Sequence, residues 1–216
     1  MKDNKKCLMI AISFLIIAVL YTILVKTVDV ASIGPNGSEV GFSTLNRFVR
    51  DGLGTSDFWY HVTKYLGIVP FFIVAFYAVQ GLLQLIKNKS IQKVDRRLIL
   101  LGCLYVLLGI TYIFFEKVII NYRPVIMDGE LEASYPSSHT MLAMVICLSS
   151  LLIGKYYIKN RDLLKGFTIG TIILMLLLVI GRILSGVHWI SDILGGIIIS
   201  ITLVSIYVTA INWQKK

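Results

Sequence analysis

Six apolar segments of this sequence are each long enough, or nearly so, to cross a lipid bilayer as a helix. A transmembrane helix needs about 20 mostly apolar residues. The segments run over 7–25, 65–86, 98–115, 139–158, 166–183 and 193–211. Lys155 interrupts the fourth, but its charged end can reach the membrane interface beside Tyr156 and Tyr157. We therefore predict an all-α fold, a polytopic membrane helical bundle with six transmembrane helices in one domain over 1–216.

The composition agrees with a membrane protein and excludes several other classes. Hydrophobic residues make up 56% of the chain and charged residues only 15%, against about 25% charged residues in ordinary soluble domains. This excludes a disordered chain and disfavours a soluble enzyme. The net charge of +9 comes from residues scattered between the apolar segments, so we expect no nucleic-acid partner. The three cysteines lie within apolar segments and form neither a CxxC motif nor a disulfide pattern.

The distribution of charge predicts the orientation of the bundle. Most of the 21 basic residues lie in the two terminal segments and the connections near 87–97 and 155–165. Most of the 12 acidic residues lie in the connections near 26–64, 116–138 and 184–192. The positive-inside rule places both termini in the cytoplasm and the latter three connections outside. The first apolar segment is too long for a signal peptide and lacks an Ala-x-Ala site, so we expect an uncleaved span.

The first outer connection should contain a short amphipathic helix. Gly34-Pro35-Asn36-Gly37 predicts a turn. After it, Phe42, Leu45, Phe48 and Val49 recur at helical spacing between polar residues. We expect this helix to lie in the membrane interface.

Polar residues cluster at membrane depth in the second and third outer connections, where each is costly unless it is paired or functional. There are three groups, all at the outer ends of predicted spans. They are Lys117 with Arg123-Pro124; Pro136-Ser137-Ser138-His139; and Arg182 with His188 and Asp192. Because the groups share one side of the membrane, they can converge on one site.

The residue types in these groups suit a phosphate. Arg123 and Arg182 offer planar donor forks that match phosphate oxygens, and Lys117 adds a compact charge. Ser137 and Ser138 precede a predicted helix, whose first backbone N–H groups can bind an anion.

The two histidines suit phosphoryl transfer. His188 and Asp192 are four residues apart, so on a helix they would share one face. A carboxylate so placed can fix the imidazole tautomer and leave the other nitrogen free to attack phosphorus. His139 could protonate the leaving group, and the cations would stabilise the charge on the equatorial oxygens.

The three groups resemble the signature of the type 2 phosphatidic acid phosphatase family of membrane lipid phosphatases. That signature is Lys-x6-Arg-Pro, then Pro-Ser-Gly-His, then Ser-Arg-x5-His-x3-Asp. The third motif reads Gly181-Arg182-x5-His188-x3-Asp192 here, with its Arg, His and Asp spacings intact. The resemblance covers about 117–192, and the six-span layout extends it to most of the chain.

Three positions depart from the family pattern. Only five residues separate Lys117 from Arg123, and the strict spacing falls on Glu116. Ser138 replaces a glycine, which preserves a backbone donor if its φ angle allows. Gly181 replaces a serine, so a hydroxyl donor to phosphate is lost.

The resemblance implies a role for each site residue. His188 would attack phosphorus and form a phosphohistidine, Asp192 would orient it, and His139 would protonate the leaving group and then activate water. Lys117, Arg123, Arg182, Ser137 and Ser138 would bind the phosphate. Members of the family typically need no divalent metal, so we expect no cofactor and no metal ligands. Clustered carboxylates of a two-metal site are not found near these motifs.

We therefore predict a multi-pass enzyme of a bacterial plasma or inner membrane, with its site on the extracytoplasmic side. Its partner would be a lipid phosphate or diphosphate such as undecaprenyl diphosphate, phosphatidylglycerol phosphate or phosphatidic acid. The sequence does not indicate the lipid or the oligomeric state. An alternative is a protein that binds or transports a lipid phosphate at a degenerate, non-hydrolytic site. A vanadate-type haloperoxidase shares the phosphate motifs, but six apolar spans in so small a chain argue against it.

Overall fold

The computed structural model describes residues 2–127 and 129–213. The helices in this part of the chain are α1 (Lys2–Thr27), α2 (Ser43–Leu53), α3 (Asp57–Leu66), α4 (Val69–Asn88), α5 (Arg96–Lys117), α6 (Ser138–Tyr157), α7 (Arg161–Ser185) and α8 (Ile190–Asn212). Two short 3-10 helices, η1 (Pro35–Gly37) and η2 (Ile91–Lys93), lie in connections. Six helical stretches are long and apolar enough to span a membrane, as predicted, and α3 and α4 together form the second.

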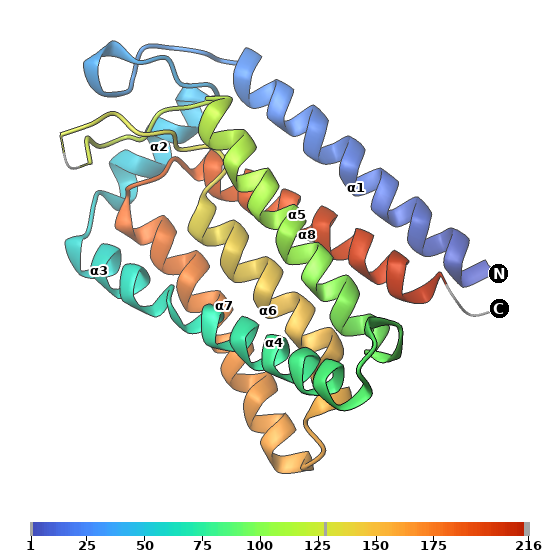
Figure 1. The fold of residues 1–216 in the computed structure, drawn as a ribbon. Helices are drawn as coiled ribbons and strands as arrows, with labels where there is room; N and C mark the ends of the chain where they lie inside the picture. The colour runs from blue at the N-terminus through green and yellow to red at the C-terminus, as the bar shows by residue number, and fades with distance from the viewer. Residues whose placement is uncertain (1, 128, 214–216) are drawn as a thin grey trace.

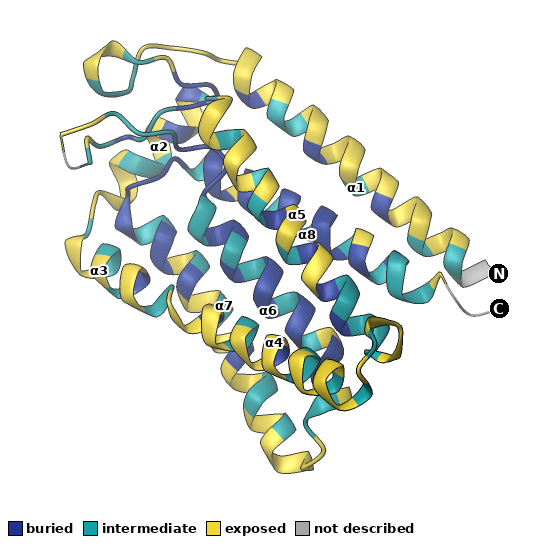
Figure 2. Cartoon of the chain, in the orientation of Figure 1, coloured by how far each residue is buried: buried dark blue, intermediate teal, exposed yellow. Residues whose placement is uncertain are grey.

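Helices α6 and α8 form the centre of the bundle (Figures 1 and 2). Helix α1 packs along α8, and α3 packs along α7. Met141 and Val145 of α6 and Leu203 and Tyr207 of α8 belong to the buried apolar core. Large apolar side chains remain exposed on the outer helices, such as Phe72 of α4. Apolar side chains on the outer surface are what a helical bundle surrounded by lipid requires.

Helix α2 is the short amphipathic helix predicted after the turn at 34–37. Its polar face is turned inward, because Ser43 and Asn46 are buried. Leu45, Phe48 and Leu53 are exposed. The Asn46 side chain accepts a hydrogen bond from the Ser191 N–H (3.1 Å) at the start of α8. The helix thereby joins the first long connection to the part of the bundle where the sequence motifs lie.

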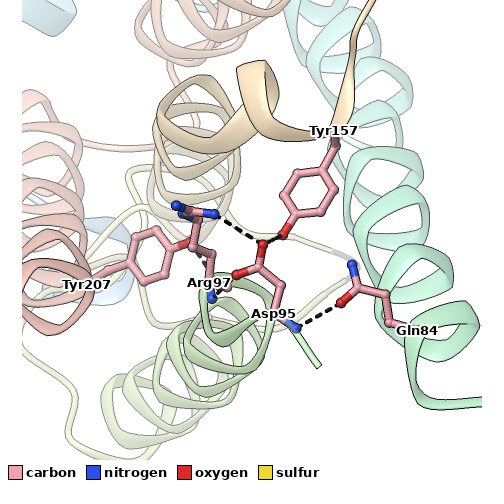
Figure 3. A network of polar contacts seen from close by, with 5 residues as sticks. All are labelled: Gln84, Asp95, Arg97, Tyr157 and Tyr207. Carbon is pink, nitrogen blue, oxygen red and sulfur yellow. Dashed lines mark hydrogen bonds and ion pairs between the residues drawn. The ribbon is translucent and has the colours of Figure 1, made fainter. Parts of the chain in front are cut away.

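The α1 start and the α8 end lie together at one end of the bundle (Figure 1), where Asn212 Nδ2 lies 3.9 Å from Cys7 Sγ. A polar network stabilises the α4–α5 connection (Figure 3). Asp95 accepts hydrogen bonds from Tyr157 Oη (2.7 Å) and Arg97 Nη1 (3.2 Å), and its N–H donates to Gln84. The connection is thus attached to α4 and α6.

Candidate active site

A short hairpin between α5 and α6 brings the first two motifs onto the start of α8. The Ser134 N–H donates to the Asn121 carbonyl (2.9 Å), and the Arg123 N–H donates to the Glu132 carbonyl (3.0 Å). The Ser137 N–H donates to the Asp192 carbonyl (2.9 Å), which joins the start of α6 to α8. All three motif groups therefore meet at one end of the bundle, as the sequence predicted.

Asp192 lies in the first turn of α8 and is completely buried. Its carboxylate accepts hydrogen bonds from Ser134 Oγ (2.5 Å), Asn121 Nδ2 (3.0 Å) and the Trp189 N–H (3.1 Å). Donors of this kind are what a buried carboxylate needs in order to compensate for its loss of hydration. The last of these bonds also caps the helix, because Trp189 is the residue before its first turn.

His188 does not lie on a helix face with Asp192, so that sequence-based expectation was wrong. Helix α8 begins at Ile190, and His188 belongs to the turn between α7 and α8. A hydroxyl connects the two side chains instead. Ser134 Oγ donates to Asp192 Oδ2 and lies 3.0 Å from His188 Nδ1.

These contacts determine the tautomer of His188. Nδ1 also lies 3.2 Å from the Ser134 carbonyl, which can only accept a hydrogen bond. The proton of the Ser134 hydroxyl is already directed at Asp192. Nδ1 must therefore carry the hydrogen, and Nε2 has a free lone pair. Nε2 is buried and has no hydrogen-bond partner among the described residues. This is the state that a histidine nucleophile requires.

The surroundings of His188 keep its ring neutral. Burial lowers the pKa of His188 well below its ordinary value, because the charged form loses its hydration. The nearby positive charges of Arg123 and Arg182, and His139, lower this pKa further. Side chains from all three motifs are thus close enough to His188 to influence its protonation.

Several buried nitrogens beside His188 have no hydrogen-bond partner within the part of the chain that the structure describes. They are Nδ1 of His139, Nε and Nη1 of Arg182, Nε of Arg123 and Nε2 of His188. Arg123 Nε lies 3.0 Å from Glu132 Oε2, but the angle does not make a hydrogen bond. We call these four residues the cationic site. Buried polar groups are normally paired, so this arrangement fits an anion with several oxygens.

The two serines of the second motif differ in their contacts. Ser137 is buried, and its N–H donates to the Asp192 carbonyl, so this amide does not face an anion as expected. Ser138 begins α6 with a helical backbone, so the glycine of the family pattern is not needed there for its φ angle. The first amides of a helix have no acceptor within it. Those of Ser138 and His139 therefore remain candidates for binding phosphate.

The remaining two departures have different structural settings. Lys117 is the last residue of α5 and is exposed, and it makes no hydrogen bond or ion pair with the cationic site in the described chain. Its phosphate-binding role stays a prediction. At Gly181, an added Cβ would lie 2.5 Å from Thr63 Cγ2 and 3.1 Å from the Trp59 ring. Close packing of α3 on α7 therefore explains why the serine of the pattern is replaced by glycine.

Sequence reasoning did not identify Ser134 and Asn121, whose side chains donate hydrogen bonds to Asp192. Both are polar residues at predicted membrane depth between motif residues, which is the signal that could have found them. It also missed α3, which lies beside the site. Tyr60 of α3 has its ring centroid 5.8 Å from the Arg182 guanidinium carbon.

The fold and the site together define a multi-pass membrane protein in which two histidines and two arginines meet at one end of the helical bundle. The model of the PAP2 superfamily matches residues 67–216, and the chain belongs to this superfamily. Among solved structures, it is similar to a transmembrane PAP2-type phosphatidylglycerolphosphate phosphatase from Bacillus subtilis, with a TM-score of 0.60 and 17% identity. That match covers 96% of this chain and 98% of the other. A comparison with curated proteins gives no match.

Proposed function

We propose that this protein is a lipid phosphate or diphosphate phosphatase that acts through a phosphohistidine on His188. The observation that carries the proposal is the group of unpaired buried nitrogens in the cationic site. Nε and Nη1 of Arg182 are donors that an oxygen-rich anion would satisfy, and Arg123 Nε has only its ion pair with Glu132. The lone pair on Nε2 of His188 is left free to attack such an anion at its central atom. Membership of the PAP2 superfamily supports a phosphate as that anion.

In the proposed first step, Nε2 of His188 attacks the phosphorus atom. A P–N bond forms as the bond from phosphorus to the leaving oxygen breaks, and His139 gives that oxygen a proton. Arg123 and Arg182 hold the other phosphate oxygens, where charge spreads in the transition state. The Nδ1–H of His188 is oriented by Ser134, whose hydroxyl is bound to Asp192.

In the second step, water replaces the histidine. His139, now neutral, removes a proton from the water, whose oxygen bonds to phosphorus as the P–N bond breaks. This releases inorganic phosphate and returns His188 to the neutral Nδ1–H form. The low pKa of His188 supports this cycle, because the ring does not retain a proton that would block its nucleophilic nitrogen.

We further propose that the site faces the extracytoplasmic side, with both termini in the cytoplasm. The charge bias of the connections supports this orientation. Since the cationic site lies at the end of the bundle opposite the termini, a lipid headgroup in the outer leaflet could reach it. The candidate substrates are undecaprenyl diphosphate, phosphatidylglycerol phosphate and phosphatidic acid.

We also propose that the reaction needs no metal ion. Within 2–127 and 129–213, no group of three or more His, Cys, Asp or Glu side chains is placed to hold one. The arginines provide the positive charge that a metal ion supplies in other phosphatases. Activity should then persist in EDTA.

The test is phosphate release by the purified protein in detergent with EDTA present, over the three candidate lipids and a soluble phosphate ester. We expect phosphate release from at least one lipid. In His188→Ala, the rate of that release should fall about 1,000-fold. His61→Ala is a matched control, because His61 is an exposed histidine outside the cationic site. Thermal unfolding checks that both variants are folded.

Quenching in alkaline SDS after reaction with a 32P-labelled substrate tests the intermediate. We expect an acid-labile, base-stable phosphoprotein from wild type and none from His188→Ala. Tight lipid-phosphate binding without release from any substrate would instead favour the alternative of a non-hydrolytic binding or transport protein. The exposed position of Lys117 and the missing serine hydroxyl at Gly181 keep that alternative worth testing.

A further inference from the structure

One face of α3 is directed at the cationic site. Tyr60, Thr63, Lys64 and Gly67 follow the i, i+3, i+4, i+7 spacing that places residues on one helix face. Thr63 packs on α7 at Gly181, and a Cβ at Gly67 would lie 3.4 Å from the Cδ2 atom of His139. The same face therefore touches α7 in the middle and a histidine of the site at its end.

Two cations lie near a single aromatic ring on this face. The Tyr60 ring centroid is 5.8 Å from the guanidinium carbon of Arg182 and 5.7 Å from Nζ of Lys64. Both distances are in the range of cation–π attraction. Arg182 is buried in the site, whereas Lys64 is exposed. Tyr60 thus connects a cation inside the site with a cation at its edge.

Lys64 has no acidic partner in the part of the chain that the structure describes. Its ammonium group sits on a flexible four-carbon stem and has three donors available for an anion. The four residues of the cationic site can surround one phosphoryl group. A second anionic group, on the leaving side of the substrate, would extend from that site towards its edge.

We propose that Lys64 binds a second phosphate in the leaving group and so makes the enzyme selective for substrates that carry one. This inference rests on the proposed phosphatase function. The leaving group of undecaprenyl diphosphate is a lipid monophosphate, and that of phosphatidylglycerol phosphate is a phosphodiester lipid. The leaving group of phosphatidic acid is an uncharged alcohol, which has no phosphate for Lys64 to bind.

The test compares farnesyl diphosphate with farnesyl monophosphate, which share a tail and differ by one phosphate. Wild type should have the higher kcat/KM for the diphosphate. Lys64→Gln should lower kcat/KM for the diphosphate about three- to fivefold, the upper part of the range for one charged contact at an exposed site. The monophosphate value should change less than about twofold. Phosphatidylglycerol phosphate and phosphatidic acid provide a second pair.

Two further variants separate a specific contact from a general loss of charge. Lys64→Arg keeps the cation beside Tyr60 and should retain most of the preference. Arg47→Gln removes an exposed charge on α2 that lies among Ser43, Thr44 and Asp51 and not among the residues of the cationic site, so kcat/KM for both substrates should stay unchanged. Because Lys64 is exposed, the preference for the diphosphate should also weaken as the salt concentration rises from about 50 to about 500 mM.

The outcomes distinguish this inference from the function on which it rests. If Lys64→Gln lowers kcat/KM equally for both substrates, or for neither, the inference is wrong while phosphatase activity stands. A wild type that prefers the monophosphate also overturns it. If wild type releases no phosphate from any substrate in either pair, the proposed function itself fails.

Discussion

The hydroxyl of Ser134 offers a sharp test of how the nucleophile is positioned, through the variant Ser134→Ala. In the structure, this hydroxyl donates to Asp192 Oδ2 at 2.5 Å and lies 3.0 Å from Nδ1 of His188. All three residues are buried. Removing the hydroxyl breaks the connection between the carboxylate and the imidazole, and water cannot easily replace it.

The size of the effect follows from what each group retains. Asp192 keeps its bonds from Asn121 Nδ2 and the Trp189 N–H, and His188 keeps the Ser134 carbonyl at 3.2 Å. The variant therefore loses about one hydrogen bond to a charged group, worth about 1.5–3 kcal/mol. At about 1.4 kcal/mol per tenfold change, kcat/KM should fall roughly 10- to 100-fold.

The assay is phosphate release from whichever lipid wild type hydrolyses best, with single-turnover labelling of the phosphohistidine. Ser191→Ala is the matched control. Ser191 Oγ lies 3.4 Å from the same carboxylate and makes no bond to His188. We expect this control to lose at most a few-fold in kcat/KM, because it does not connect the carboxylate to the ring.

Two results would refute the reasoning. In the first, Ser134→Ala remains within twofold of wild type while its thermal unfolding is unchanged. In the second, it loses no more than Ser191→Ala, which would mean that the carboxylate acts without the hydroxyl. Because the Ser134 carbonyl still accepts from Nδ1–H, the tautomer of His188 should survive in the variant, and 15N NMR of the imidazole can check this.

Three further predictions concern packing, protonation and the opposite end of the bundle. Gly181→Ser should unfold at a lower temperature and lose activity, because its Cβ would lie 2.5 Å from Thr63 Cγ2; adding Thr63→Ser removes that methyl group and should restore part of both. The ring of His188 should remain neutral at pH 6 by 15N NMR, because its pKa is well below the ordinary value, and an imidazolium signal there would contradict this. Since the unfolded chain does take up that proton, stability should fall as the pH drops below about 6.5. Tyr157→Phe should destabilise the fold by about 1 kcal/mol, because it loses the hydrogen bond to Asp95 (2.7 Å), and should leave kcat/KM unchanged. A loss of activity without a loss of stability would argue against a purely structural role for Tyr157.

The six spans could be predicted from hydropathy because each is a long local pattern. The helices extend only a few residues beyond the predicted segments at most ends, as for α5 and α8. Helix α3 was not predicted, because 57–64 mixes charged, polar and aromatic residues without a continuous aliphatic run. Its local start signal is the N-cap Ser56, whose side chain accepts a hydrogen bond from the Trp59 N–H. Its packing against α7 is a tertiary contact that the local sequence does not reveal.

The motif residues could be predicted, but the contacts among them could not. Regular spacing identified His139, His188, Asp192 and the two arginines. Ser134 reaches Asp192 only because the hairpin folds back onto α8, a contact between residues 58 positions apart. The expected helix face for His188 and Asp192 was wrong because α8 begins after His188. Spacing fixes which residues are near in sequence, and tertiary folding decides which atoms meet.

Gly181 and Lys64 are linked through the packing of α3 on α7, because Thr63 next to Lys64 lies against Gly181. Any side chain larger than hydrogen at Gly181 would push α3 away from α7 at Thr63. The same movement would carry Tyr60 away from Arg182, and Lys64 with it, since all three α3 residues share a face. The substitution that removes a hydroxyl donor from the family motif therefore permits α3 to bring a cation to the edge of the site. Gly181→Ser should therefore lower the diphosphate preference as well as the stability, and adding Thr63→Ser should recover part of both together.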